Sequence, residues 1–334
     1  MRHHPPPIQQ LMGDLPEARV NPSCTFVKCG VDYAGPFMLR SIVQRSKVTI
    51  KGYLAIFVCF VTRAVHLEVV SAMTAFLGAF QRFISRRGLC SEIYSDCGSN
   101  FKGASAELRR VFLEYVGHEL NGRISNYLAD NSIQWKFNPP GAPHMGGLWE
   151  AGVKSAKYHL HRVVGPHRLT FEEFYTVATR TEAILNSRPL SPLTTDPSDD
   201  EVLTPGYFLI GRSLISVPEP DLTDVTDNRL RRWEHVKKMM QVFWRRWTRE
   251  YLSRLQQRPK WLNHRSEFRV NDLVLIRDER QAPLTWPRGR IVKLHPGPDG
   301  KTRVVTIKTA TNEIQRPIVK LCLLPVDSSV IMDK

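Results

Sequence analysis

The chain has 334 residues, of which 42% are hydrophobic, a formal net charge of +15 and six cysteines that form no Cys-x-x-Cys pair. Its longest apolar run, residues 54–61, is far too short to cross a bilayer, and no apolar stretch follows the charged N-terminus as in a secretory signal. These features exclude a largely disordered chain, a membrane-spanning protein and a disulfide scaffold, and they indicate an intracellular globular protein of two or three domains.

Most of the positive charge lies in the last third of the chain. Residues 229–334 contain 24 lysines and arginines against 10 acidic residues, a net charge of +14. A segregated basic region indicates a phosphate backbone as partner, although a solvated, solubilising face has the same composition. Charge alone leaves both readings open, so the motifs must separate them.

Strand and helix patterns alternate through the first two thirds of the chain. After a proline-rich arm, the apolar periodicity predicts strands at 25–32, 53–61, 66–70, 91–96 and 133–137, and helices at 74–87, 104–120, 148–163 and 170–187. Thr170 and Glu173 form a capping-box pattern at the start of the last helix. This order predicts a mixed α/β sheet with helices on its faces.

The last third has a different pattern. A proline-rich connector precedes a predicted amphipathic helix, in which apolar residues from Trp233 to Leu255 recur at spacings of three and four and are expected to pack rather than to stack on bases. From Phe268 onward the alternation predicts short strands at 270–277, 288–294, 303–308 and 313–324, with a hairpin turn at Asp299-Gly300. A small barrel of about five strands is the natural closure.

Three acidic residues stand where a catalytic site would need them. Asp32 and Asp96 each end a predicted strand, and Glu150 lies in the first turn of a predicted helix behind a loop rich in proline and glycine. Any one of them alone is more often a turn residue or a partner of the helix dipole. Together, at one edge of a sheet, three carboxylates repel one another unless they share a cation, and hard oxygen ligands favour Mg²⁺ or Mn²⁺.

The helix that carries Glu150 also presents two lysines. Lys154 and Lys157 follow Glu150 at i+4 and i+7, on one helical face. Such a face can hold a metal ion and the adjacent phosphates. A plain Glu-to-Lys helix pair also explains Lys154.

Six blocks of the chain resemble retroviral-type integrases, and the likeness is greatest to those of BEL/Pao-type LTR retrotransposons. The blocks are Val31–Phe37, Ser95–Phe101, Pro139–Glu150, Ala183–Leu190, Leu203–Arg212 and Trp286–Val292. The resemblance implies a ribonuclease-H-like core followed by a basic helix and a small SH3-like β-barrel. It also implies an Asp-Asp-Glu triad of Asp32, Asp96 and Glu150 that binds two Mg²⁺ or Mn²⁺ ions for DNA 3′-end processing and strand transfer.

The resemblance and the basic patches suggest how the chain meets DNA and how it is divided. The residues expected to contact DNA are Asn100, His144, Lys154, Lys157, Arg245, Arg246, Arg288 and Arg290. The expected division is an arm at 1–22, an integrase catalytic core at 23–215, a connector at 216–228, a basic amphipathic helix at 229–262, a DNA-binding β-barrel at 263–326 and a tail at 327–334.

The sequence departs from the integrase pattern in two places. Asp96 and Glu150 stand 54 positions apart, wider than in retroviral integrases, which fits a helix-and-loop insertion around 105–132. The zinc module that usually precedes such a core needs two His and two Cys, but the adjacent His3 and His4 and the spacing of Cys24 and Cys29 fit zinc poorly. We therefore expect no zinc in this chain, and both cysteines in the core.

The expected partners are retroelement terminal DNA, host target DNA and further copies of the same chain, with action in the nucleus and no membrane. Three other readings stay open. The first is a catalytically silent, domesticated DNA-binding protein derived from an integrase. The second is a ribonuclease-H-type RNA nuclease on the same fold, and the third is a chromatin-interaction module in the barrel.

Overall fold

The computed structural model describes residues 17–41, 48–72, 75–96, 98, 101–107, 110, 133–138, 147–165, 167–194, 196, 199–256, 268–278 and 280–324, with the backbone alone at 18 and 147–153. The elements of the first part are α1 Glu17–Val20, β1 Lys28–Arg40, β2 Thr49–Cys59, β3 Val65–Val70, α2 Phe76–Arg87, β4 Glu92–Ser95, β5 Gln134–Phe137, α5 Gly147–Val164 and α6 Phe171–Asn186. None of the helices in these ranges combines the length and the apolar character that a membrane crossing needs.

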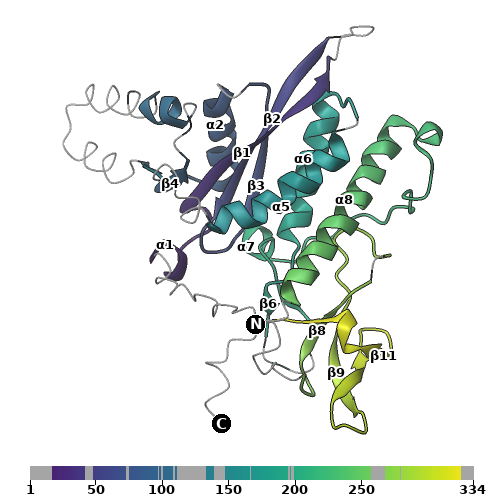
Figure 1. Ribbon diagram of the computed structural model, residues 1–334. Coiled ribbons are helices and arrows are strands. Elements are labelled where there is room, and N and C mark those ends of the chain that lie inside the picture. The colour runs from purple at the N-terminus through teal and green to yellow at the C-terminus, as the bar shows by residue number, and fades with distance from the viewer. Residues whose placement is uncertain are drawn as a thin grey trace, which may run out of the picture.

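A five-stranded mixed sheet forms the centre of this part. Its strand order is β3-β2-β1-β4-β5. The pairs β3–β2 and β2–β1 are antiparallel, whereas the pairs β1–β4 and β4–β5 are parallel. Figure 1 shows α2 on one side of the sheet and α5, α6 and α8 on the other. This arrangement confirms the predicted mixed α/β fold with flanking helices and is compatible with a ribonuclease-H-like core.

Both faces of the sheet are buried, which explains the nearly continuous apolar run of β2. Leu54, Ile56 and Val58 pack on the side of α5, α6 and α8 (Arg232–Leu255), whereas Ala55 and Phe57 pack on the side of α2. Successive side chains of a strand point to opposite faces of the sheet. When helices cover both faces, every side chain is buried, and the strand is apolar throughout.

The first strand differs from its sequence prediction. It begins at Lys28, runs to Arg40 and carries Asp32 in its interior, so Asp32 does not end it. Pairing with β2 on one side and β4 on the other extends the strand, and a register shift at Gly35-Pro36 lets it continue past a residue that has no N–H to donate. Cys24 precedes the strand and is exposed, contrary to the prediction of a core position, whereas Cys29 is buried.

Other predicted elements are found within a few residues of their expected bounds. The capping box of α6 is complete: the Thr170 hydroxyl accepts from the Glu173 N–H, and the Glu173 carboxylate accepts from the Thr170 N–H. Of the predicted helix 104–120, residues 104–107 and 110 are helical, and the described helix begins earlier, at residue 101. The rest lies outside the described residues, as does most of the proposed insertion.

The last third forms a second sheet attached to a long helix. Its elements, with the short ones that precede them, are β6 Ser191–Pro192, β7 Val202–Leu203, α7 Tyr207–Ile210, η3 Asp227–Arg229, α8 Arg232–Leu255, β8 Leu273–Ile276, β9 Arg288–Pro296, β10 Thr302–Lys308, β11 Glu313–Pro317, η4 Ile318–Lys320 and β12 Leu321–Leu323. The strand order β11-β10-β9-β8-β12 leaves β11 and β12 at the edges, so the hydrogen-bonded ladder does not close into the barrel that we predicted.

Trp286 joins this sheet to the rest of the molecule. Its ring lies edge-on to Trp244, Trp247 and Tyr251 of α8, with centroids 4.9, 6.1 and 5.6 Å away, and its indole N–H donates to the Ser187 hydroxyl at 3.1 Å. The apolar stripe of α8 is thus mostly a packing surface, as predicted, although Trp233 at its start is 52% exposed.

Candidate active site

Two of the three predicted catalytic carboxylates are brought together by the register of two parallel strands. Lys28 of β1 pairs with Glu92 of β4, and Gly30 pairs with Tyr94. Both segments continue for two residues beyond these pairs, to Asp32 and to Asp96, so the register sets the two acids at the same end of neighbouring parallel strands. The sequence predicted this meeting from two strand ends, but the structure makes it from a strand interior and the residue after β4.

Asp32 projects from the face of the sheet that α5 covers. It pairs across β1 and β2 with Ile56, a core residue on that face, and directly paired residues project to the same side. The Lys157 ammonium of α5 donates to Asp32 Oδ2 at 2.5 Å, and the Tyr33 N–H donates to Oδ1 at 2.6 Å. The side chain of Asp32 remains 29% exposed, so its carboxylate has a cationic partner and access to solvent.

Asp96 lies at the start of a tight turn. Its Oδ1 accepts from the Gly98 N–H at 3.0 Å, and a Cβ at position 98 would lie only 3.0 Å from the same oxygen, so glycine suits this turn. The preceding Ser95 is anchored because its hydroxyl accepts from the Trp135 indole N–H at 2.9 Å and donates to the Asp96 carbonyl. The carboxylate of Asp96 is therefore held at a fixed strand end and is exposed.

The third predicted carboxylate belongs to the N-terminal turn of α5. Glu150 lies seven residues before Lys157, about two turns along the same face of the helix that reaches Asp32. Its backbone is helical, and its side chain lies outside the described residues. Lys154, one turn before Lys157, is exposed. Asn100 and His144, which we expected near DNA, also lie outside the described residues.

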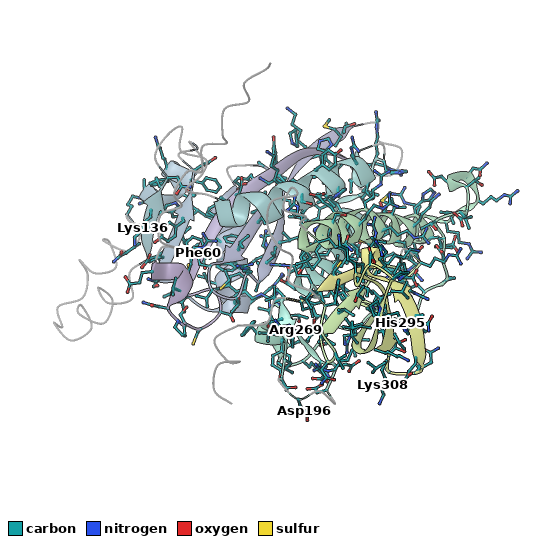
Figure 2. All side chains as sticks on the ribbon, turned by 60° about the horizontal axis from the view of Figure 1, so that its bottom comes forward. Phe60, Lys136, Asp196, Arg269, His295 and Lys308 are labelled. Carbon is teal, nitrogen blue, oxygen red and sulfur yellow. The ribbon has the colours of Figure 1, made fainter. Side chains whose placement is uncertain are left out.

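Three of the four arginines that we expected to contact DNA make hydrogen bonds within the chain. Arg245 donates to Asp221 at 2.6 Å, Arg288 to the Asp200 carbonyl at 2.5 Å, and Arg290 to the Asp196 carbonyl at 2.7 Å. The last two tie the C-terminal sheet to the 196–200 segment, and Figure 2 shows Asp196 beside that sheet. Arg246 is exposed on α8.

Two other basic residues of the C-terminal sheet are open to solvent. Lys293 of β9 and Lys308 of β10 are exposed. On β10, the buried Val305 and Ile307 point inward, so Thr306 and Lys308 point to the outer face. Lys293 pairs with Thr306 and therefore lies on the same outer face. Figure 2 places Lys308 on the outer part of this sheet. The two lysines thus form a positive surface, which sequence analysis did not single out because many basic residues flank them.

The described part of the chain contains a second group that could hold a metal ion. One ligand atom from each of His167, Asp227 and His235 lies within 4.8 Å of the others. Two imidazoles and a carboxylate are ligands that zinc binds, so this group bears on our expectation that the chain holds no zinc. However, the Lys238 ammonium already donates to Asp227 at 2.7 Å, and Arg162 and Arg246 line the same hollow. Those positive charges disfavour a divalent cation there.

Comparisons with known proteins match the last third and, weakly, the whole chain. Residues 231–324 match a family of unknown function, DUF5641. The match spans α8 and all five strands of the C-terminal sheet. The chain is also similar to a chain in the cryo-EM structure of the simian T-cell lymphotropic virus intasome in complex with PP2A regulatory subunit B56 gamma. That similarity has a TM-score of 0.35 and 11% identity, and it covers 95% of this chain and 86% of that one. No curated protein matches.

Sequence reasoning missed how the charges of the site are paired. Lys157, which we expect to contact DNA, is also the counter-ion of Asp32, 125 positions away. The i+7 spacing from Glu150 predicts one shared helical face, and the Lys157 side chain on that face reaches Asp32. No local pattern indicates which strand that face meets, so no sequence signal could have identified the ion pair.

Proposed function

We propose that this protein is an integrase-type polynucleotidyl transferase, which uses divalent metal to process DNA 3′ ends and to join them to target DNA. The observation that carries the proposal is the placement of Asp32 and Asp96 on adjacent parallel strands, beneath the helix that carries Glu150 and Lys157. The proposal includes action in the nucleus on retroelement ends and host DNA, and assembly with further copies of the chain.

The donor chemistry of the two described carboxylates fits Mg²⁺ or Mn²⁺. Both offer hard oxygens that solvent can reach, and the ammonium on Asp32 indicates that the site favours positive charge. Asp32, Asp96 and Glu150 would hold the metal, which when bound activates the attacking oxygen and stabilises the leaving oxygen of a phosphodiester. Lys157 and Lys154 provide positive charge along α5 beside the carboxylates, where a DNA backbone would pass.

The test is metal-dependent resolution of a branched DNA substrate, the reverse of strand joining. The full chain is incubated with Mg²⁺ or Mn²⁺, with EDTA as the metal-free arm and an RNA–DNA hybrid as the competing substrate. We expect cleavage and rejoining of the branched DNA that EDTA stops. Cleavage of the hybrid alone would replace this proposal with a ribonuclease-H activity.

One observation favours a second candidate, a catalytically silent DNA-binding protein. The Lys157 ammonium occupies Asp32 Oδ2, one of the oxygens that a metal ion would need. If this pair persists in the presence of Mg²⁺ or Mn²⁺, the chain binds DNA without cutting it. DNA binding without any resolution of the branched substrate would support this candidate.

Replacing Lys157 by methionine separates the two candidates. Removal of the ammonium leaves the Asp32 carboxylate without its cationic partner, so Mn²⁺ affinity is expected to rise by about thirtyfold, the effect of one unit charge on a divalent ion at about 4 Å in water. Isothermal titration with Mn²⁺ measures the change, and Lys51→Met, at an exposed lysine of β2 outside the candidate site, is the matched control. Equal affinities in wild type and Lys157→Met would mean that Asp32 is not a metal ligand.

The exposed lysines of the C-terminal sheet give a second prediction. Replacing Lys293 and Lys308 by glutamine is expected to weaken duplex DNA binding and to reduce the slope of log K against log salt by about 0.9 for each phosphate that the protein no longer neutralises. Fluorescence anisotropy at several salt concentrations measures both. Arg303→Gln is the control, because Asp299 already neutralises Arg303 through two hydrogen bonds. An unchanged slope in the double variant would place the DNA-binding surface elsewhere.

A further inference from the structure

A large cavity lies between the sheet and the helices that cover it. Its volume is about 320 Å³, and Leu54, Ile56, Val65 and Leu67 of the sheet form one wall. The opposite wall consists of Ala156 and Leu160 of α5, Leu185 of α6, and Trp247 and Tyr251 of α8. Protein interiors are close-packed and seldom hold voids much larger than a water molecule. An apolar cavity of roughly 150 Å³ already takes up benzene, so this one can hold a substantial apolar group.

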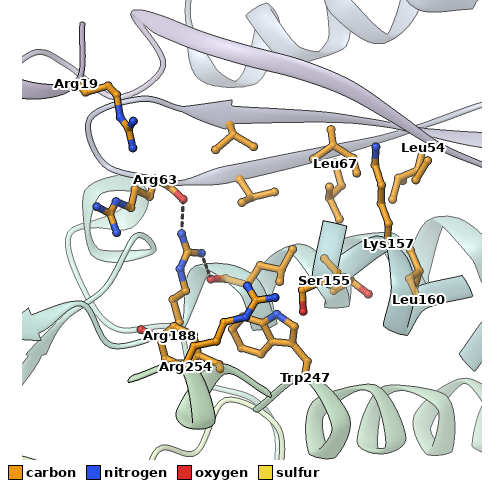
Figure 3. Close-up of a pocket in the computed structure, with 18 residues that line it drawn as sticks. Arg19, Leu54, Arg63, Leu67, Ser155, Lys157, Leu160, Arg188, Trp247 and Arg254 are labelled. Carbon is orange, nitrogen blue, oxygen red and sulfur yellow. Dashed lines mark hydrogen bonds between the residues drawn. The ribbon is translucent and has the colours of Figure 1, made fainter. Parts of the chain in front are cut away.

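The mouth of the cavity is positively charged. Arg19, Arg63 and Arg188 lie together at one end, as Figure 3 shows, whereas Lys157 lies at the other. Lys157 is neutralised by Asp32, and the lining Arg254 by Glu250. Among the residues that the structure describes, no carboxylate lies within 4 Å of Arg19, Arg63 or Arg188. The cavity therefore combines an apolar interior with three guanidinium groups that have no carboxylate partner within the described part of the chain.

Arg188 is half-buried at this end of the cavity. Within the described ranges, its guanidinium donates to two carbonyls, those of Leu185 and Arg63, at 2.5 and 2.7 Å. Burial, together with the positive charge of Arg63, lowers the pKa of Arg188 to about 10, and burial lowers that of Arg19 as well. A desolvated cation without an anionic partner is unfavourable, and a bound anion removes that penalty.

We propose that this cavity binds a small amphipathic organic anion, with its acidic group on Arg63 and Arg188 and its apolar chain or ring between the sheet and α8. The acidic group faces the arginine end because the opposite end, at Lys157, already has its carboxylate. The proposal does not depend on DNA chemistry, and it holds whether or not the chain is an integrase.

Calorimetric titration of the full chain with decanoate, below its micelle concentration, tests the proposal. Decanol and decyltrimethylammonium have the same chain with no charge and with the opposite charge, and acetate has the acidic group without the chain. We expect decanoate to bind at least tenfold more tightly than each of the three, to a single site. Equal binding of decanoate and decanol would overturn the role of the arginines, and absence of decanoate binding would overturn the site.

Two variants locate the binding. Arg63→Gln removes an exposed side chain, so it should fold, and it should weaken decanoate binding by about tenfold, the worth of one charge-assisted hydrogen bond, without affecting decanol. Ala156→Leu places extra carbons inside the cavity and should block binding and raise the melting temperature. The control is Arg212→Gln, at an exposed arginine outside the cavity. Unchanged binding in both Arg63→Gln and Ala156→Leu would place the ligand elsewhere and overturn the proposal.

Discussion

Replacing Asp96 by asparagine is expected to reduce metal-dependent resolution of branched DNA by on the order of 10³-fold or more. Asparagine keeps the size of the side chain and can still accept from the Gly98 N–H, but it removes the charge that a divalent ion needs. Metal ligands contribute several kcal/mol of transition-state stabilisation, and each 1.4 kcal/mol corresponds to about a tenfold change in rate. Glu150→Gln is expected to have the same effect if its carboxylate joins the site.

The control for this experiment is Asp224→Asn, which makes the same chemical change at an exposed aspartate of the segment before α8. It should leave the rate unchanged. DNA binding and melting temperature should be nearly the same in all of these proteins, since Asp96 is exposed. If Asp96→Asn and Glu150→Gln resolve the branched substrate as fast as wild type, the triad is not catalytic and the integrase proposal fails.

Replacing Glu68 by alanine is expected to destabilise the fold by about 3–5 kcal/mol, the usual result of breaking a buried ion pair by removing one partner. The Glu68 side chain of β3 is fully buried and accepts from Arg82 at 2.6 Å, from Arg86 at 2.9 Å and from His66 at 3.1 Å. Without it, the acidic partner that the described residues leave to the imidazole of His66 is Glu182. Chemical denaturation at neutral pH measures the loss, which is a large share of a typical stability of about 5–15 kcal/mol.

The stability that Glu68 contributes depends on pH, because the contribution requires the charged carboxylate. Burial tends to raise the pKa of Glu68, but His66 and Arg82 outweigh it and lower that pKa below its ordinary value of 4.5. A lowered pKa means that the charged form stabilises the fold above pH 4.5, and that this contribution is lost as the pH falls through the folded-state pKa. The difference in the free energy of unfolding between wild type and Glu68→Ala should therefore become smaller below pH 4.5.

A matched exposed pair serves as the control for Glu68. Glu107 accepts two hydrogen bonds from the exposed Arg110, so Glu107→Ala should change the stability far less than Glu68→Ala does. Similar losses in the two variants would contradict a special role for burial at Glu68. If the difference in the free energy of unfolding between wild type and Glu68→Ala is the same at neutral and acid pH, the charge of Glu68 is not what stabilises the fold.

The sequence by itself determined the elements whose signals are local. The alternation in β3, the apolar stripe of α8 and the capping box at Thr170 all depend on neighbours within one or two turns or along one strand, and each element was found where it was predicted. The sequence also predicted which carboxylates would form the candidate site, because acids beside small or bend-forming residues stand out in it.

The tertiary structure decided how these residues meet. Asp32 lies inside a strand because β2 and β4 extend that strand on both sides, and it meets Lys157 across 125 positions of chain. The buried partners of Glu68 and the arginines around the cavity likewise come from separate elements. Charge pairing, burial and cavity volume depend on which surfaces pack together. Local periodicity in a single sequence does not reveal these long-range contacts.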